Sequence, residues 1–304
     1  MNTTQTYHVF CLSETLSPLS HMMGTSGNEA LVNRESVRTE NGIKLIPFIS
    51  GNAIRHRVIR DAGSHFLINL YELAGKLNID QMNFMLSGGS LTESSVTDNM
   101  KTIADMQRLF PLYRLLGGSL KNQIITGALQ VSRGVLVCEE NREILNKILP
   151  EELRALSKTL MGAESFVSSY QYTRGDISKI NGIDKLLMLD ELAQKRESTL
   201  MIYTGQNIVR NSLFVHEFTL TNVSQNELGA LLSAINCWQN SNGIIGGNSR
   251  IGHGRLKTYV YLSEEQSAQG LIDEYQKYAE SVKEEAISWL YAAFAKKEKE
   301  KVKK

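Results

Sequence analysis

The sequence predicts an α+β fold, a βαββαβ plait with large insertions. A short run of strand-forming residues opens the chain at 7–12, and leucines at helical spacing over 225–239 lie between strand-like segments at 199–221 and 256–262. The order strand, helix, strand therefore occurs twice, as it does in this plait.

The first strand, 7–12 (YHVFCL), is followed by a Ser/Pro turn cluster. Residues 13–46 are polar and contain three glycines, so we expect a long connection there. Long connections in compact domains are often functional.

The next segment predicts a turn and then a helix. Pro47 to Asn52 forms the turn, Asn52 caps the helix, and the helix covers 53–77 with a break near Gly63.

The middle of the chain has weaker patterns. We expect one or two strands at 124–138, a short helix at 151–161, a hairpin or loop at 163–182, a helix at 185–195, and two strands with a central turn at 199–221.

The C-terminal part begins with the helix 225–239. A Gly-rich loop at 243–254, the strand 256–262 and a helix from Glu264 onward follow. The stripe of that last helix is Leu271, Tyr275, Tyr278, Val282, Ala286, Trp289 and Ala293. We expect a palm with its insertions at 1–262, comprising a loop or fingers at 13–46 and a thumb region at about 155–198. The C-terminal helix and basic tail occupy 263–304.

Composition excludes several classes of protein. The 304 residues have 42% hydrophobic and 21% charged content and a formal net charge of +1, so any nucleic-acid site must be a local basic patch. No signal peptide or membrane span is expected. Cys11, Cys138 and Cys237 are read as reduced structural thiols of a cytoplasmic protein.

Common catalytic and metal-binding motifs are absent from the sequence. There is no GxxxxGK[ST], HExxH, CxxC or GxSxG, and no histidine lies at metal-ligand spacing, so we expect no metal and no cofactor. His8 and His216 fall in strand-like segments and are expected in the core or on a sheet face.

The first candidate site is the Gly-rich loop GIIGGNSRIGHGRLK, residues 243–257. Its glycines permit close approach of backbone amides to a ligand, and Arg250 and Arg255 offer bidentate contacts to phosphate. A helix precedes the loop and a strand follows it, which excludes a dinucleotide-binding loop. A tight turn with solvated arginines is the alternative.

The second candidate is the helix start IPFISGNAIRHRVIRDAG, residues 46–63. On a helical wheel Arg57 and Arg60 lie opposite the apolar face and are expected to be solvated, whereas Arg55 lies on the apolar side. A buried arginine needs a partner, either an internal carboxylate or an RNA phosphate at the helix N-terminus.

The third candidate is SFVSSYQYTRGDISK, residues 165–179. Tyr170, Tyr172 and Arg174 alternate along a predicted strand and therefore share one side. Aromatic side chains beside a cation suit base stacking in single-stranded RNA, and an ordinary exposed hairpin is the alternative.

These segments, in this order, resemble the RAMP superfamily of CRISPR proteins, and more narrowly the Cas-seven backbone family. The similar features are the strand YHVFCL, the long loop, the helix start PFISGNAIR and the late loop GGNSRIGHGRLK. The stretch 109–141 is similar to the corresponding part of type IV members. The resemblance extends to about residue 262.

The resemblance implies a ferredoxin-like, RRM-type palm with fingers and a thumb hairpin that wedges into guide RNA (crRNA) and flips a base at regular intervals. Copies of the subunit would stack along one guide as a helical filament. The other implied partners are the target DNA strand paired to the guide, a Cas-five-like subunit, a large subunit and a helicase. A membrane is not among them.

The resemblance also implies the RNA-binding residues, by their places in the matching segments. They are Ser50, Asn52, Arg55, Arg57, Arg133, Tyr170, Tyr172, Arg174, Lys179, Asn248, Ser249, Arg250, His253 and Arg255. Arg133 is expected on the central sheet, and the thumb is expected between Tyr170 and Lys179.

One departure bears on catalysis. Type III members cut target RNA with an aspartate in the loop after the first strand, and residues 13–46 here contain no aspartate. The sequence therefore favours a non-catalytic, DNA-targeting subunit. The alternative is a metal-dependent, type III-like RNase that uses Glu29 or Glu35.

Overall fold

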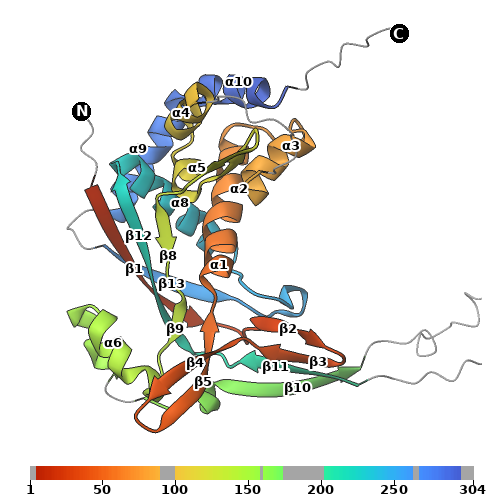
Figure 1. The fold of residues 1–304 in the computed structure, drawn as a ribbon, viewed down its shortest axis with the longest axis vertical. Helices are drawn as coiled ribbons and strands as arrows, with labels where there is room; N and C mark the ends of the chain where they lie inside the picture. Colours follow the sequence, from red (N-terminus) through yellow and green to blue (C-terminus); the bar gives the residue numbers. More distant parts are fainter. Residues whose placement is uncertain (1–4, 90–99, 158–159, 174–201, 263–266, 296–304) are drawn as a thin grey trace, which may run out of the picture.

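The computed structural model describes residues 5–89, 100–157, 160–173, 202–262 and 267–295 (Figure 1). Within these residues the chain forms three sheets. The largest has the strand order β13-β1-β12-β9-β5-β4, with β8 paired beside β12.

Four positions of the largest sheet form the predicted plait. β1 (Gln5–Thr15) lies between β13 (Leu256–Leu262) and β12 (Leu213–Val223), and β12 pairs with the short strands β8 (Leu129–Val131) and β9 (Gly134–Leu136). Every one of these pairs is antiparallel. The spatial order is fourth, first, third, second strand, as in a ferredoxin-like, RRM-type βαββαβ palm, so the predicted fold class is confirmed.

Two helical segments connect the plait strands and contact each other. The first consists of α1 (Gly51–Ala53), the π-helical η1 (Ile54–Asp61) and α2 (Ala62–Leu70), and the second is α8 (Gln225–Asn240). Their buried side chains form the main core together with Tyr7, Val9 and Cys11, which alternate along β1.

The other face of the sheet has a smaller apolar cluster. Leu12 of β1 and Val215 of β12 contact Leu145 and Leu149 there. Leu145 belongs to α6 (Arg142–Ile148), which follows η3 (Glu139–Asn141). The plait is therefore covered fully on one face and partly on the other.

The first helical segment corrects three details of the prediction. Ser50 is the N-cap in place of Asn52, because its hydroxyl accepts the Ala53 N–H at 3.2 Å. No break occurs at Gly63, where a Cβ would lie 2.8 Å from the Leu112 side chain, so this glycine allows close packing. The segment ends at Leu70 and does not reach residue 77.

Residues 13–46 are not a loop, which corrects the prediction. They include β2 (Met22–Ser26), β3 (Glu29–Val32), β4 (Arg34–Thr39) and most of β5 (Gly42–Ile49). β5, which also takes up Pro47 of the expected turn, pairs with β9 and β4 at the edge of the main sheet. No residue of β4 is buried, so the segment lacks the apolar alternation by which strands are recognised.

The second sheet has the order β10-β11-β3-β2. It contains β10 (Val167–Thr173) and β11 (Ile202–Ile208), which form an antiparallel pair. The predicted strands at 199–221 correspond to β11 and β12. Residues 174–182 of the expected hairpin and the expected helix 185–195 lie outside the described residues.

The remaining elements lie mostly around the helical side of the palm (Figure 1). They are α3 (Ile79–Met82), η2 (Asn83–Ser87), α4 (Met100–Leu109), α5 (Pro111–Leu116), β6 (Gly118–Leu120), β7 (Gln123–Ile125), η4 (Glu151–Ser157), η5 (Ala163–Phe166), η8 (Ser249–Ile251), α9 (Ala268–Ser281) and α10 (Lys283–Ala293). The predicted C-terminal helix is thus two helices, divided at Val282, although its apolar stripe is confirmed at Leu271, Tyr275, Ala286 and Ala293. Among the described helices, none has the length and apolarity to span a bilayer.

Candidate nucleic-acid interface

The Gly-rich loop between α8 and β13 has left-handed backbone at several residues, three of them in its second half. Asn248, Gly252 and Gly254 have φ values of 59°, 89° and 88°. A Cβ on Gly254 would lie 2.1 Å from the Ile245 carbonyl oxygen, so only glycine fits where the loop closes on itself. Arg250 and Arg255 project from this loop and are exposed.

Ser20 and His21 connect the Gly-rich loop to the start of the first helix. The Ser20 hydroxyl lies 2.7 Å from His253 Nδ1 and 3.4 Å from Asn248 Nδ2, and its carbonyl accepts the Gly247 N–H. The next residue, His21, accepts the Ser50 N–H at Nε2 over 3.0 Å. The first and second sequence candidates are therefore neighbours in space.

Burial determines the charge state of the two histidines in this cluster. His21 is buried and His253 half-buried, and desolvation lowers the pKa of each imidazole below its ordinary value. Both are therefore neutral at pH 7, and His21 carries its proton on Nδ1 because Nε2 is an acceptor. The positive charge of the site comes from its arginines.

Tyrosine side chains of β10 and β11 extend from the loop along the second sheet. The Tyr170 hydroxyl accepts a hydrogen bond from Asn248 Nδ2 at 2.7 Å, and its ring meets His253 edge-on. Tyr172 stacks between Tyr170 and Tyr203, with ring centroids 6.0 and 5.4 Å apart. Tyr170 and Tyr172 share one side as predicted, and Tyr203 extends the row.

The helix start presents Asn52 and Arg57 at the surface. Arg57 Nη1 donates to Asp61 Oδ2 at 3.0 Å, one turn further along. Arg57 and Ser249 line the same pocket of about 220 Å³, so the helix start and the Gly-rich loop bound one hollow.

Arg55 and Arg60 are both directed into the protein. Arg55 donates to the Leu116 carbonyl and Arg60 to the Gly117 carbonyl at 2.9 Å. Burial lowers the pKa of both guanidinium groups. The expectation that Arg60 is solvated was therefore wrong. The i→i+5 hydrogen bonds of η1 bring residues that are five apart towards one face of the helix, and an α-helical wheel does not show this.

The partner of Arg55 in this structure is therefore a backbone carbonyl, whereas the sequence predicted a carboxylate or an RNA phosphate. Leu116 and Gly117 end α5, where unpaired carbonyls and the helix dipole favour cations. Capping of the C-terminus of α5 explains the inward orientation of Arg60 fully and that of Arg55 in part.

Arg133 lies apart from the loop cluster. It occupies the turn between β8 and β9 rather than a strand of the central sheet, with its guanidinium 5.0 Å from the Phe48 ring centroid. It forms an ion pair with Glu35 of β4.

Of the predicted site residues, Arg174 and Lys179 lie outside the described residues. Three other residues of the cluster were not predicted from the sequence. The residues missed are Ser20, His21 and Tyr203. Ser20 and His21 fall in the segment expected to be a loop, and no spacing links them to residue 248 or 253. The strand prediction at 199–221 was the available signal for Tyr203.

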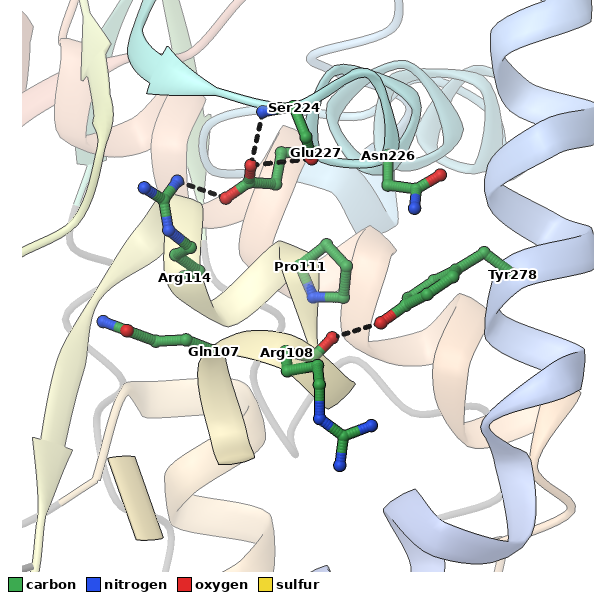
Figure 2. Close-up of a pocket in the computed structure, with 8 residues that line it drawn as sticks. All are labelled: Gln107, Arg108, Pro111, Arg114, Ser224, Asn226, Glu227 and Tyr278. Atoms are coloured by element: carbon green, nitrogen blue, oxygen red, sulfur yellow. Dashed lines mark hydrogen bonds and ion pairs between the residues drawn. The ribbon is translucent and has the colours of Figure 1, made fainter. Parts of the chain in front are cut away.

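Another pocket, of about 300 Å³, lies between α4, α5, α8 and α9 (Figure 2). Its arginines are engaged: Arg114 pairs with Glu227 and Arg108 with Glu285. Glu227 also accepts from Ser224, which completes the capping box of α8. These contacts belong to helix packing, so we assign no ligand to this pocket. Throughout the described part of the chain, no three His, Cys, Asp or Glu side chains group as metal ligands.

The sequence matches no protein-family model and no curated protein. The structure is similar to a chain of a solved "Type IV-B CRISPR Complex", with a TM-score of 0.55 over 86% of this chain and 92% of that chain. The two sequences are 15% identical, so the similarity establishes a shared fold. The fold and the site together define the class of protein. It is an α+β protein with an RRM-type palm, an edge hairpin and a second sheet beside a Gly-rich loop.

Proposed function

We propose that this protein is a non-catalytic, guide-RNA-binding backbone subunit of a cytoplasmic CRISPR effector complex, in the type IV, DNA-targeting branch. The observation that carries the proposal is that three segments are joined in space: Ser20 and His21 connect the Gly-rich loop to the helix start, and Asn248 connects the loop to the tyrosine row. The fold shared with a chain of a Type IV-B CRISPR complex supports the same assignment.

The loop and the helix start would bind the RNA backbone. Arg250 and Arg255 are exposed and have no carboxylate partner within the described residues. Guanidinium groups in that state are free for bidentate contact with phosphate oxygens. Such contacts do not depend on the base, as a subunit that accepts any guide sequence requires.

The tyrosine row would bind bases. Tyr170 is held by Asn248 and by contact with Gly205, where a Cβ would lie 2.4 Å from its ring, so it is fixed. Tyr172 is 51% exposed and offers its ring to solvent. Aromatic rings at this position suit stacking on unpaired bases of single-stranded RNA.

Surfaces suited to further copies of the subunit lie on the β4–β5 hairpin. Ile43 and Leu45 on one of its faces are 73% and 54% exposed. The hairpin also borders a groove of about 840 Å³ that is lined by both acidic and basic side chains, Glu139, Glu140 and Glu143 beside Arg38, Lys44, Arg142 and Lys147 among them. An exposed apolar face beside a groove with charges of both signs suits contact with the next subunit along a guide. The target DNA strand, a Cas-five-like subunit, a large subunit and a helicase are the other partners proposed.

The absence of catalysis is part of the proposal. Glu35, one candidate for a type III-like RNase, is engaged by Arg133, and Glu29 lies on a different strand, β3. Neither carboxylate belongs to a group of three potential metal ligands among the described residues.

Two experiments test the proposed function. The protein should co-purify with a discrete small RNA when it is expressed with a CRISPR array, seen as a high absorbance ratio and one gel band. The assembled complex should leave a complementary RNA intact in Mg²⁺. Cuts at regular spacing that disappear in Glu29→Ala or Glu35→Ala would replace the proposal by the RNase alternative.

A further inference from the structure

The pocket between the first helix and the Gly-rich loop has features that phosphate binding does not explain. Its lining combines Arg57, Asp61, Ala62 and His65 from the helix with Cys237, Trp238 and Ser241 at the end of α8, and Ile244, Gly246 and Ser249 of the loop. Its volume of about 220 Å³ is below the roughly 300–1,000 Å³ of drug-sized ligand sites. It therefore suits one planar ring system rather than a whole nucleotide.

One wall of the pocket is apolar and rigid. Trp238 is 6% exposed, and its indole N–H donates to the Ile244 carbonyl at 2.9 Å, which fixes the ring. Ala62 and Ile244 complete this wall. The small exposed part of the indole and the apolar atoms beside it favour a flat, weakly polar ligand over a hydrated phosphate.

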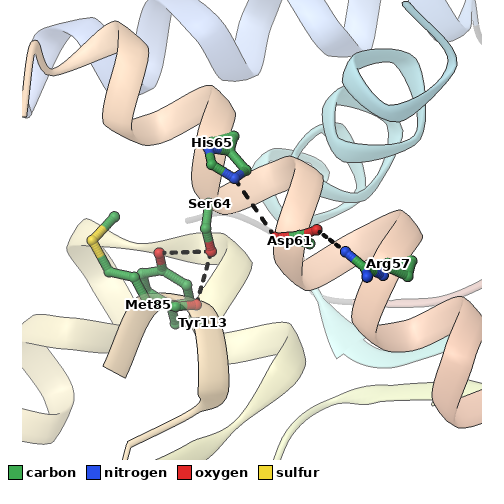
Figure 3. Close-up of polar contacts among 6 residues, drawn as sticks. All are labelled: Arg57, Asp61, Ser64, His65, Met85 and Tyr113. Carbon is green, nitrogen blue, oxygen red and sulfur yellow. Dashed lines mark hydrogen bonds and ion pairs between the residues drawn. The ribbon is translucent and has the colours of Figure 1, made fainter. Parts of the chain in front are cut away.

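The opposite wall is polar but electrically balanced. Asp61 lies between Arg57, at 3.0 Å, and His65, whose Nε2 is 3.6 Å from Asp61 Oδ1 (Figure 3). The carboxylate thus offsets the guanidinium, so this wall does not select an anion. The Ser249 hydroxyl has no hydrogen-bond partner among the described residues and is free to bind the edge of a ring.

We propose that this pocket receives one nucleobase of the bound single-stranded RNA, an inference that rests on the proposed function. The adjacency of Ser249 and Arg250 in the chain supports it. A strand whose phosphate contacts Arg250 would carry a base directly beside Ser249. The loop would thus hold the backbone on its outer side and one unstacked base on its inner side.

The first test compares a short single-stranded RNA with an abasic strand of the same length, which keeps the phosphates and lacks the bases. Ser241→Phe places a ring in the pocket from the exposed end of α8. It should weaken binding of the base-bearing strand about tenfold, in the range of one lost stacking contact. Binding of the abasic strand should not change. The matched control is Asn240→Phe, which adds the same ring at an exposed neighbouring residue outside the pocket lining.

The second test uses the unmodified protein and is independent of how a variant folds. Cys237 lines the pocket, whereas Cys11 and Cys138 are buried, so iodoacetamide should alkylate Cys237 first. The base-bearing strand should slow this reaction, and the abasic strand should leave its rate unchanged.

The outcomes separate the two proposals. The base pocket is refuted, and the RNA-binding function stands, if three results occur together. Both strands bind the unmodified protein, Ser241→Phe changes the affinity for neither strand, and neither strand protects Cys237. An equal loss for both strands also refutes the base pocket, since the groove would then hold only backbone. If neither strand binds the unmodified protein, the proposed function itself fails.

Discussion

At the scale of single residues, four arginines near the first helix and the Gly-rich loop form two groups that differ in their contacts. Arg250 and Arg255 extend from the loop into solvent, whereas Arg55 and Arg60 donate to the carbonyls that end α5. The first group is free to contact a ligand without disturbing the fold. The second group is part of the fold itself, and this difference leads to two predictions.

Arg250→Ala and Arg255→Ala should each weaken RNA binding and flatten its dependence on salt. Loss of one phosphate contact lowers the log–log slope by about one unit, because fewer counterions are released. The melting temperature should stay unchanged, since neither side chain is buried. The measurement is affinity at several salt concentrations, with Lys277→Ala on α9 as a charge-matched control at an exposed site. A slope equal to that of the unmodified protein would mean that the loop is only a turn.

Arg60→Ala should destabilise the protein by about 2 kcal/mol, because the buried Gly117 carbonyl would lose its donor. Arg57→Ala on the same helix removes only an exposed ion pair with Asp61 and should cost less than about 0.5 kcal/mol. Arg55→Ala should lie between the two. Denaturant unfolding of the three variants measures this order, and equal stabilities for Arg57→Ala and Arg60→Ala would contradict it.

Sequence patterns predicted correctly that Arg57, Arg250 and Arg255 are exposed, but they misplaced Arg60 and Arg133. The helical wheel assumes α-helical spacing, and nothing in the residue types of 54–61 indicates a π-helix. Ser20 and His21 were missed for a related reason. Their role depends on a long-range contact to the Gly-rich loop, which local periodicity does not encode.

At the scale of elements, the second sheet and the Gly-rich loop are held together by the hydrogen bond from Asn248 to Tyr170. Tyr170→Phe keeps the ring and removes this bond. We expect faster hydrogen exchange of the loop amides at 247–252 and RNA affinity about fivefold lower, the effect of one hydrogen bond. Tyr172→Phe is the control, because the Tyr172 hydroxyl is exposed on the same strand. Identical exchange in the two variants would show that the loop is ordered without Tyr170.

The central sheet should make stability depend on pH. Burial of His216 in β12 lowers its pKa from 6.5 to about 4, and its Nδ1 has no partner. Between these values the unfolded chain binds a proton that the folded protein excludes, so the free energy of unfolding falls as the pH falls. The slope from His216 approaches about 1.4 kcal/mol per pH unit, and above pH 6.5 its contribution is constant.

His216→Gln should reduce this slope, whereas His56→Gln, at an exposed position, should not. Unfolding curves between pH 7 and pH 4 provide the comparison. The account of His216 is wrong if its replacement leaves the pH dependence as it was. The prediction that both histidines lie in the core or on a sheet face is confirmed: His216 is buried in the sheet, and His8 lies on an exposed face of β1 and pairs with Glu217.

The sequence predicted the elements of the palm well and the insertions poorly. β1, β12, α8 and β13 have alternating or helical apolar patterns because each packs on the core. β4 and the first half of β5 carry no buried residue, so their pattern resembles a loop. The Asn41–Gly42 pair is a turn signal of the kind that marks hairpins, and it was the available local clue to this hairpin.

At the scale of the whole molecule, a net charge of +1 must be reconciled with the proposed RNA binding. The exposed Arg250 and Arg255 of the Gly-rich loop form a local basic site, whereas the groove beside α6 is lined by acidic and basic side chains in equal number. A local basic site can bind RNA at low net charge, and a groove with charges of both signs offers complementary ion pairs to a neighbouring copy. A filament along RNA would therefore grow with the length of the strand.

The most direct test of the backbone-subunit proposal is the mass of the complexes formed on single-stranded RNA of two lengths, one twice the other, at low salt. The account predicts several copies on the shorter strand and about twice as many on the longer one, because each copy covers a fixed stretch of backbone. One copy on both strands, or a protein that stays monomeric and unbound, would contradict it.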